Sequence, residues 1–137
     1  MTISAKITVL GAGSYGTALA ICLARNGHKT LLWGRDASQV DDMVNERENT
    51  KYLAGCPFPE SLQLISDLEA AVNASDNILV VVPSHAFGGM LKQIKSMLKP
   101  QAKIAWATKG LDPQTGDLLQ NVARSIVGDD VALAVLS

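Results

Sequence analysis

A glycine-rich hexapeptide near the start of the chain, GAGSYG at residues 11–16, has the pattern G-x-G-x-x-G. The pattern is common by itself, but here it follows an apolar run and opens a helical pattern. In that context Gly11 permits a tight turn, Gly13 lets a pyrophosphate approach the backbone, and Gly16 lets the helix pack close to the strand. The start of the helix would offer N–H groups to phosphate oxygens. The pattern therefore predicts a dinucleotide-binding loop, with a purely structural turn as the alternative.

Side chains in and after this loop indicate which dinucleotide would bind. Ser14 could donate its hydroxyl, and Tyr15 could place a ring edge over the ligand. Proteins that bind NAD usually carry an acid at the end of the second strand, about 20 residues on, for the ribose 2′-hydroxyl. Here that strand ends in Trp33-Gly34-Arg35, and the guanidinium of Arg35 suits a 2′-phosphate and adenine stacking. We predict NADP or NAD as cofactor, with NADPH favoured; a solvated loop charge is the alternative for Arg35. Asp36 could accept from the ribose or cap the following helix.

Two later segments carry further candidate residues. Phe87 could pack on the dinucleotide or be a core residue at the start of a helix, and His85 could carry a proton or be an exposed loop histidine. Lys109 follows an apolar strand and precedes a glycine, so its ammonium would face a ligand cleft. There it could bind a substrate phosphate or hydroxyl, or polarise a carbonyl oxygen. A surface lysine is the alternative.

Short apolar runs alternate with helical patterns along the whole chain, and these elements must position the candidates. We expect strands at residues 6–10, 29–33, 62–65, 77–82, 103–107 and 131–136, and helices at 14–26, 36–48, 67–74, 87–98 and 115–127. Consecutive apolar residues at 78–82 indicate a strand buried on both faces, which is typical of parallel sheets covered by helices. The fold predicted is α/β: a doubly wound, mostly parallel sheet of about six strands. Ligands bind such sheets beyond the carboxyl ends of the strands, so the loops after the first and fourth strands should border the site.

Composition excludes several other classes of protein. The chain has 137 residues with 12 Lys+Arg against 13 Asp+Glu, which counts against nucleic acid as a partner. Its longest apolar run, Ala18–Ala24, is far shorter than the about 20 residues of a membrane-spanning helix. Cys22 and Cys56 are too few for a disulfide framework and lack metal-ligand spacing. We therefore expect one dinucleotide-binding domain over residues 1–137, with no metal site.

Four segments occur together, in order, and carry a family resemblance: GAGSYGTALA at 11–20, GHKTLLW at 27–33, VVVPSH at 80–85 and TKGL at 108–111. The combination resembles the N-terminal domain of bacterial NAD(P)-dependent glycerol-3-phosphate dehydrogenase and covers essentially the whole chain. NTKYLAG at 49–55 also matches, although the family often has proline in place of Ala54.

The resemblance implies reversible reduction of dihydroxyacetone phosphate to sn-glycerol 3-phosphate, for phospholipid synthesis. The cytoplasm is expected from the cysteines instead, because Cys22 and Cys56 suit free thiols in a reducing cytosol. It implies that Ser14, Tyr15, Arg35 and Lys109 contact the cofactor and that Lys109 also contacts the substrate. The family's proton-transferring lysine belongs to a second, helical domain, which we expect after Ser137. We therefore assign no catalytic residue to this chain and expect it to bind NAD(P)(H) without turnover. We leave open whether the protein forms a homodimer.

Two other functions stay open on the sequence. The chain could be a stand-alone module that senses dinucleotides, although no effector segment is visible in the sequence. It could also be the cofactor domain of a hydroxy-acid dehydrogenase on a similar sheet. The segments at residues 80–85 and 108–111 argue against that enzyme, through resemblance only.

Overall fold

The computed structural model describes residues 5–108 and 110–136, which form strands and helices in alternation. The elements are β1 (Lys6–Leu10), α1 (Ser14–Arg25), β2 (Lys29–Trp33), α2 (Ala37–Glu46), β3 (Leu62–Ile65), α3 (Leu68–Asn73), β4 (Asn77–Val80), α4 (Ser84–Ile94), the 3₁₀ turn η1 (Lys95–Met97), β5 (Lys103–Trp106), α5 (Leu119–Val127) and β6 (Ala132–Val135). Every predicted strand and helix is present, and the differences lie at the ends of elements.

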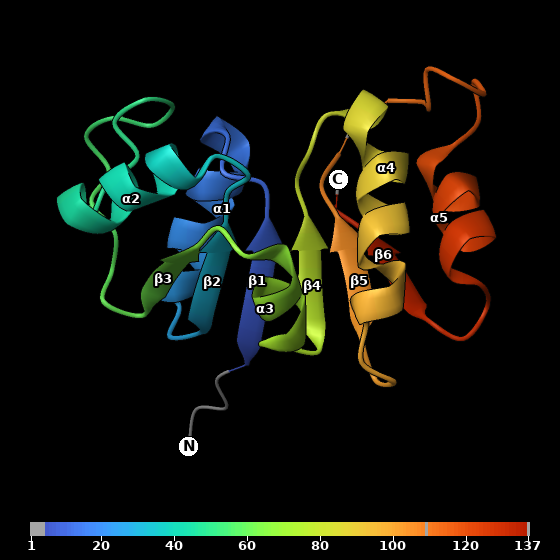
Figure 1. The fold of residues 1–137 in the computed structure, drawn as a ribbon, viewed down its shortest axis with the longest axis horizontal. Coiled ribbons are helices and arrows are strands. Elements are labelled where there is room, and N and C mark those ends of the chain that lie inside the picture. Colours follow the sequence, from blue (N-terminus) through green and yellow to red (C-terminus); the bar gives the residue numbers. More distant parts are fainter. Residues whose placement is uncertain (1–4, 109, 137) are drawn as a thin grey trace.

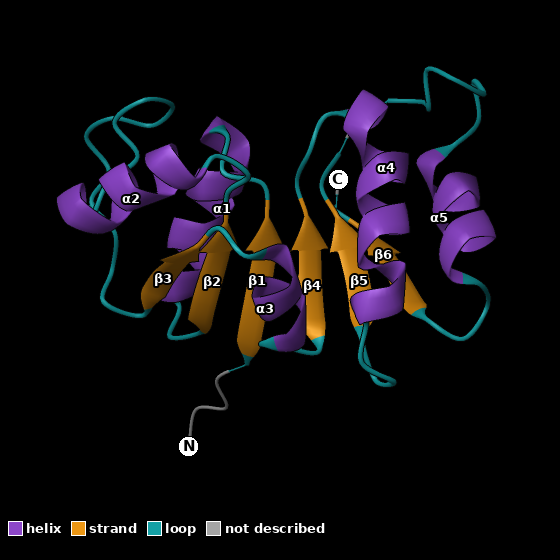
Figure 2. Cartoon of the chain, viewed as in Figure 1, coloured by secondary structure: helices purple, strands orange, loops and turns teal. Residues whose placement is uncertain are grey.

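The six strands form one sheet in the order β3-β2-β1-β4-β5-β6, and every neighbouring pair is parallel. The prediction of a doubly wound α/β sheet is confirmed. The chain winds outward from β1 through β2 to β3, and then returns to place β4 on the other side of β1. The strand order therefore reverses between the neighbouring strands β1 and β4. All strands point toward the same edge of the sheet (Figure 2).

Helices cover the two faces of the sheet and create two separate core layers. In Figure 1, α3, α4 and α5 lie in front of the sheet and α1 lies behind it. Successive strand residues alternate between the layers: Val9 packs with α1 and α2, and Leu10 packs with α3 and α4. The same alternation holds for Leu32 and Trp33. Burial on both faces explains why these strands are apolar at consecutive positions.

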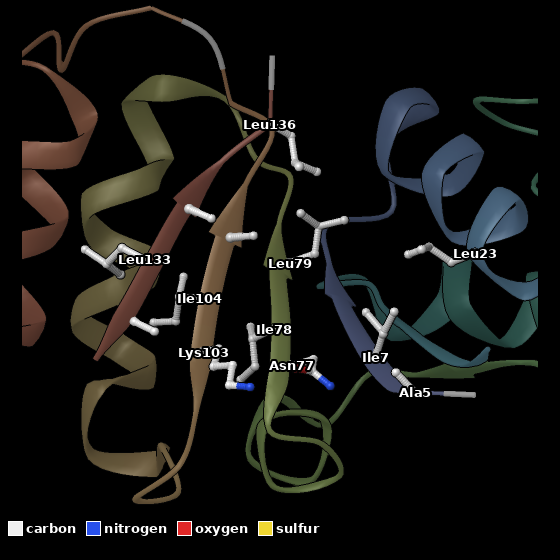
Figure 3. A pocket seen from close by; sticks show the side chains of 13 residues that line it. Ala5, Ile7, Leu23, Asn77, Ile78, Leu79, Lys103, Ile104, Leu133 and Leu136 are labelled. Carbon is white, nitrogen blue, oxygen red and sulfur yellow. The ribbon is translucent and has the colours of Figure 1, made fainter. Parts of the chain in front are cut away.

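One part of the sheet face behind β4, β5 and β6 has no helix over it in the described residues. A hollow of about 400 Å³ lies there beside α1, and we call it the apolar hollow (Figure 3). Its lining consists of Ala5, Ile7, Leu23, Asn77, Ile78, Leu79, Lys103, Ile104, Ala105, Ala132, Leu133, Ala134 and Leu136. β6 is an edge strand whose residues are exposed or half-buried.

Three helices differ from their predicted bounds by more than one residue at one or both ends, and two of these differences have a local physical reason. Helix α2 ends at Glu46 because Arg47 adopts a left-handed conformation with φ of 54°. Helix α5 begins at Leu119, four residues later than predicted, because Asp112 holds the preceding segment in a turn by accepting from the amide and hydroxyl of Thr115. Helix α4 begins at Ser84, three residues earlier than predicted.

The early start of α4 changes the interpretation of the segment after β4. The apolar periodicity of this helix begins at Phe87 and continues through Met90, Leu91 and Ile94. The first turn lies ahead of that stripe and shows no periodicity, so its residues looked like a loop.

None of the helices in the described part of the chain is both long and apolar enough to cross a membrane.

Candidate functional site

A pocket of about 570 Å³ lies at the carboxyl edge of the sheet, where β1 and β4 are neighbours. Its lining comes from the loops after β1, β4 and β5, and consists of Gly13, Ser14, Tyr15, Val81, Val82, Pro83, Ser84, Ala107 and Thr108. The loops after the first and fourth strands border this pocket, as predicted for the crevice at the carboxyl ends of the strands. We call this cavity the glycine-loop pocket.

Gly11 and Gly16 are required by the packing of the protein itself. Gly11 has φ of +126°, and a Cβ there would lie 2.0 Å from the carbonyl oxygen of Val81. A Cβ on Gly16 would lie 1.9 Å from the carbonyl oxygen of Gly11. Both contacts are shorter than any real carbon–oxygen contact, so the two glycines let the loop, α1 and the segment after β4 approach closely.

Gly13 differs, because, apart from its two chain neighbours, no atom of the described residues lies within 4 Å of the position that its Cβ would take. Its φ of −76° is accessible to any residue. Gly13 precedes Ser14 and Tyr15 at the start of α1, where helical geometry leaves N–H groups without intrahelical acceptors. No side chain of the described residues caps this end of the helix. The chain therefore presents main-chain donors beside open space, which suits an anion.

Main-chain hydrogen bonds hold the rim of the pocket. The amide of Gly11 donates to the carbonyl oxygen of Trp33 at 3.0 Å, and the amide of Val81 donates to that of Leu10 at 2.8 Å. The hydroxyl of Thr108 donates to the carbonyl oxygen of Val82 at 2.6 Å, which joins the loops after β4 and β5. The predicted ligand Lys109 lies outside the described residues.

The other predicted ligands on this edge have solvent-exposed side chains. Ser14 and Arg35 are exposed, and Tyr15 is 50% exposed. Arg35 lies two residues after the end of β2, and β2 is the neighbour of the strand that carries the glycine loop. All three side chains are free to meet a ligand that extends from the pocket toward β2.

Asp36 caps α2, as the capping alternative predicted. Its carboxylate accepts from the amides of Ser38 at 2.9 Å and Gln39 at 3.4 Å. The reciprocal bond of a capping box would need the Gln39 side chain to return to Asp36, but that side chain instead donates to Asn49. Both amides donate to Oδ1, so the cap engages one oxygen of the exposed Asp36 carboxylate.

Phe87 is a core residue and does not line the pocket, so its assignment as a cofactor-binding residue was wrong. Its ring is 0% exposed and packs against Trp106 with the ring centroids 5.3 Å apart. Because α4 begins at Ser84, Phe87 lies within the helix and on its buried side. Its ring therefore has no exposed surface that a ligand could contact. The alternative, a core residue near the helix start, is the one that the structure supports.

His85 lines a polar groove between α4 and α5, together with Asp112 and Asp117. The lining of this groove includes no residue of the glycine loop. There the Asn121 amide and the Leu118 N–H donate to the Asp117 carboxylate and lower its pKa. Asp117 is fully exposed, so this shift is a local capping effect. No cluster of three or more metal-ligating side chains occurs among the described residues.

Asn49 is a buried polar residue close to the glycine loop, and we did not predict any role for it from its position in an irregular segment. Its side-chain amide donates to the carbonyl oxygen of Ala12 at 3.1 Å and to the hydroxyl of Thr17 at 2.9 Å. These partners are 37 and 32 residues away in sequence. No short-range pattern could have indicated this contact; the match of residues 49–55 to the family motif was the only signal.

Comparison with known proteins identifies the family. The sequence profile of the family described as NAD-dependent glycerol-3-phosphate dehydrogenase N-terminus matches residues 6–137. The chain belongs to this family. It is 77% identical over 137 residues to a glycerol-3-phosphate dehydrogenase [NAD(P)+] of Colwellia psychrerythraea, and it covers 41% of that protein. The hydroxy-acid dehydrogenase alternative is thereby set aside.

Two solved structures of glycerol-3-phosphate dehydrogenases have the same fold as this chain. The crystal structure of glycerol-3-phosphate dehydrogenase from Coxiella burnetii superposes with a TM-score of 0.90 at 42% identity, over 96% of this chain and 40% of that one. The enzyme of Saccharomyces cerevisiae gives a TM-score of 0.84 at 23% identity, over 98% and 42% of the two chains, and shows the shared fold alone. The chain thus spans about two fifths of the length of these relatives.

Proposed function

We propose that residues 1–137 are the cofactor-binding domain of a glycerol-3-phosphate dehydrogenase and hold NAD(P)(H) at the glycine-loop pocket. The observation that carries this proposal is the open space at Gly13, beside the uncapped start of α1. The pocket also lies at the reversal of strand order, where open α/β sheets bind their ligands.

The described residues fit a dinucleotide. Gly11 and Gly16 would clash with protein atoms if they carried a Cβ, whereas Gly13 would not. Packing of the protein therefore explains two of the three glycines, and the third is explained by a ligand that needs the space. The amides of Ser14 and Tyr15 would hold the pyrophosphate, and the half-exposed Tyr15 ring would flank the ligand.

Arg35 supports NADPH as the favoured cofactor. It stands exposed just past the end of β2, where an acid that binds the ribose would stand in an NAD-specific protein. The neighbouring Asp36 is engaged as a helix cap. The positive charge of Arg35 would favour a 2′-phosphate on the ribose.

The reaction proposed for the whole enzyme is reversible reduction of dihydroxyacetone phosphate to sn-glycerol 3-phosphate. A bound nicotinamide supplies the hydride, and this chain binds and orients the dinucleotide against the sheet edge. By resemblance, Lys109 contacts both cofactor and substrate, and the proton-transferring lysine stands in a helical domain that follows Ser137. The chain by itself then binds dinucleotide without turnover.

The wider setting follows from the same family. We place the reaction in the cytoplasm, in the supply of glycerol 3-phosphate for phospholipid synthesis. A homodimer is the assembly to test first, and sedimentation of the purified chain over a range of concentrations distinguishes it from a monomer.

Calorimetric titration with NADPH and NADH tests the proposal. We expect both to bind, with NADPH at least as tight as NADH, and no oxidation of NADPH when dihydroxyacetone phosphate is added. Absence of binding by either nucleotide refutes the assigned pocket. A strong preference for NADH refutes only the role assigned to Arg35. Turnover near the rate of a full-length relative refutes the proposal that this chain lacks the catalytic acid.

A further inference from the structure

Asn49 lies beyond α2, is 0% exposed, and connects that segment to the glycine loop. We propose that Asn49 is a positioning residue that sets the orientation of the Ala12–Gly13 peptide and thereby aims the main-chain donors of the glycine-loop pocket. The inference rests on the proposed function, because this peptide directly precedes the Ser14 and Tyr15 amides that are assigned to the dinucleotide phosphates.

The side-chain amide of Asn49 is fully engaged by hydrogen bonds. Its Nδ2 donates to Ala12 O at 3.1 Å and to Thr17 Oγ1 at 2.9 Å. Its Oδ1 accepts from the Tyr52 amide at 3.2 Å and from Gln39 Nε2 at 3.5 Å. A carbonyl oxygen can only accept and a main-chain amide can only donate, so Ala12 and Tyr52 fix which end of the Asn49 amide faces the loop.

Peptide geometry converts this contact into an orientation of the loop. The carbonyl of Ala12 and the N–H of Gly13 belong to one planar trans peptide and point to opposite sides of it. Because Asn49 holds that carbonyl, the Gly13 N–H faces away from Asn49, and Gly13 lines the pocket. Glycine backbones have wide conformational freedom, so an anchor from outside the loop is needed to keep this peptide in one orientation.

A second contact ties the next peptide, Gly13–Ser14, to α1. Thr17 is 0% exposed, and its amide donates to the carbonyl oxygen of Gly13 at 3.0 Å. Asn49 thus bonds to residues on both sides of Gly13, one in the loop and one in the first turn of the helix. An aspartate at position 49 would keep acceptors but lose both donors, and a serine would keep only one donor. Of these side chains, asparagine alone supplies two donors and an acceptor together.

The test compares nucleotide affinity and loop geometry in matched variants of this chain. In Asn49→Asp we expect NADPH to bind about tenfold more weakly, the equivalent of one lost hydrogen bond to a charged group. We also expect the amide NMR resonances of Gly13 and Ser14 to shift in the nucleotide-free protein. Asn49→Ser, which introduces no charge into the core, should show the same two effects if the aspartate variant fails to fold.

Two controls separate positioning from general stability. Thr8→Val removes a buried side-chain bond of 2.9 Å to Ala71 in the other core layer, so it should lower the unfolding midpoint and leave NADPH affinity unchanged. Gln39→Met removes a weaker partner of Asn49 but keeps the bond to Ala12, and should also bind normally.

The outcomes distinguish this inference from the proposed function. If the unmodified chain binds NADPH and both Asn49 variants bind it equally well with unshifted Gly13 resonances, the positioning role is wrong and the cofactor site stands. If the unmodified chain binds no nucleotide, the proposed function fails, and the Gly13 and Ser14 resonances of the free variants still decide whether Asn49 sets the loop.

Discussion

The glycine-loop pocket and the apolar hollow are both recessed regions of this chain, but they differ in what they offer a ligand. The pocket is lined by loops at the carboxyl edge of the sheet and has the uncapped start of α1 at its rim. The hollow lies on the face of the sheet and is lined mostly by aliphatic side chains such as Ile7, Leu79 and Leu133 (Figure 3). Its polar side chains, Asn77 and Lys103, begin their strands at the opposite edge of the sheet.

The difference shows that an apolar recess does not by itself identify the ligand site of this fold. Apolar surface favours any apolar partner in proportion to the area buried and carries little directional information. Phosphate needs N–H donors held in a fixed direction, which a helix start and a glycine loop supply without side chains. The site is therefore recognised from main-chain geometry and from the open space at Gly13.

The largest effect is expected for Gly16→Ala, which tests whether the pocket is built by close main-chain packing. The added Cβ would lie 1.9 Å from the carbonyl oxygen of Gly11, so the loop and α1 would have to separate. We expect a loss of about 3 kcal/mol in the free energy of unfolding, measured by urea denaturation. A stability equal to that of the unmodified chain would contradict the packing described for the loop.

Gly13→Val separates ligand space from protein packing. Apart from the chain neighbours of Gly13, no atom in the described part of the chain lies within 4 Å of the added Cβ, so we expect the free energy of unfolding to change by less than about 1 kcal/mol. NADPH affinity should fall at least about tenfold, because the side chain would occupy the space assigned to the pyrophosphate.

Gly89→Ala is the matched control for this variant, since Gly89 also has open space around its Cβ position but lies in α4. It should leave binding unchanged and stabilise the chain by about 0.5–1 kcal/mol through helix propensity. Equal NADPH affinity in both variants would remove the reason for placing a ligand at Gly13.

Arg35→Ala tests the charge at the end of β2. We expect NADPH to bind about tenfold more weakly, a loss typical of one hydrogen bond to a charged group, and NADH to bind as before. Because Arg35 is exposed, raising the salt concentration should reduce the difference between the two proteins. An equal loss for both nucleotides would indicate contact with a part that they share.

The smallest effect is expected in the apolar hollow. Ala134→Gln adds a polar side chain to an exposed position of β6 that lines the hollow. Exposed substitutions usually change stability by no more than about 0.5 kcal/mol, and NADPH affinity should not change. Weaker binding would show that the hollow and the pocket are coupled and that the contrast drawn between them is too sharp.

Local patterns were enough to predict the elements and the loop. The apolar runs at β1, β2 and β3 gave the observed bounds, because strand propensity and the apolar pattern are local to those residues. The three glycines indicated the loop because their positions reflect the main chain itself. The first turn of α4 was missed, since Ser84 lies outside the apolar stripe that marks the rest of the helix.

The chain's own sequence determined the class of fold, the order of strands and helices along the chain, and the type of ligand that the glycine loop suits, because these depend on residues within a few positions of each other. Only the tertiary structure decided that Phe87 belongs to the core and that Asn49 contacts Ala12. Both depend on which distant segments become neighbours when the sheet forms. A side chain's burial and hydrogen-bond partners are then set by those neighbours rather than by the residues beside it in sequence.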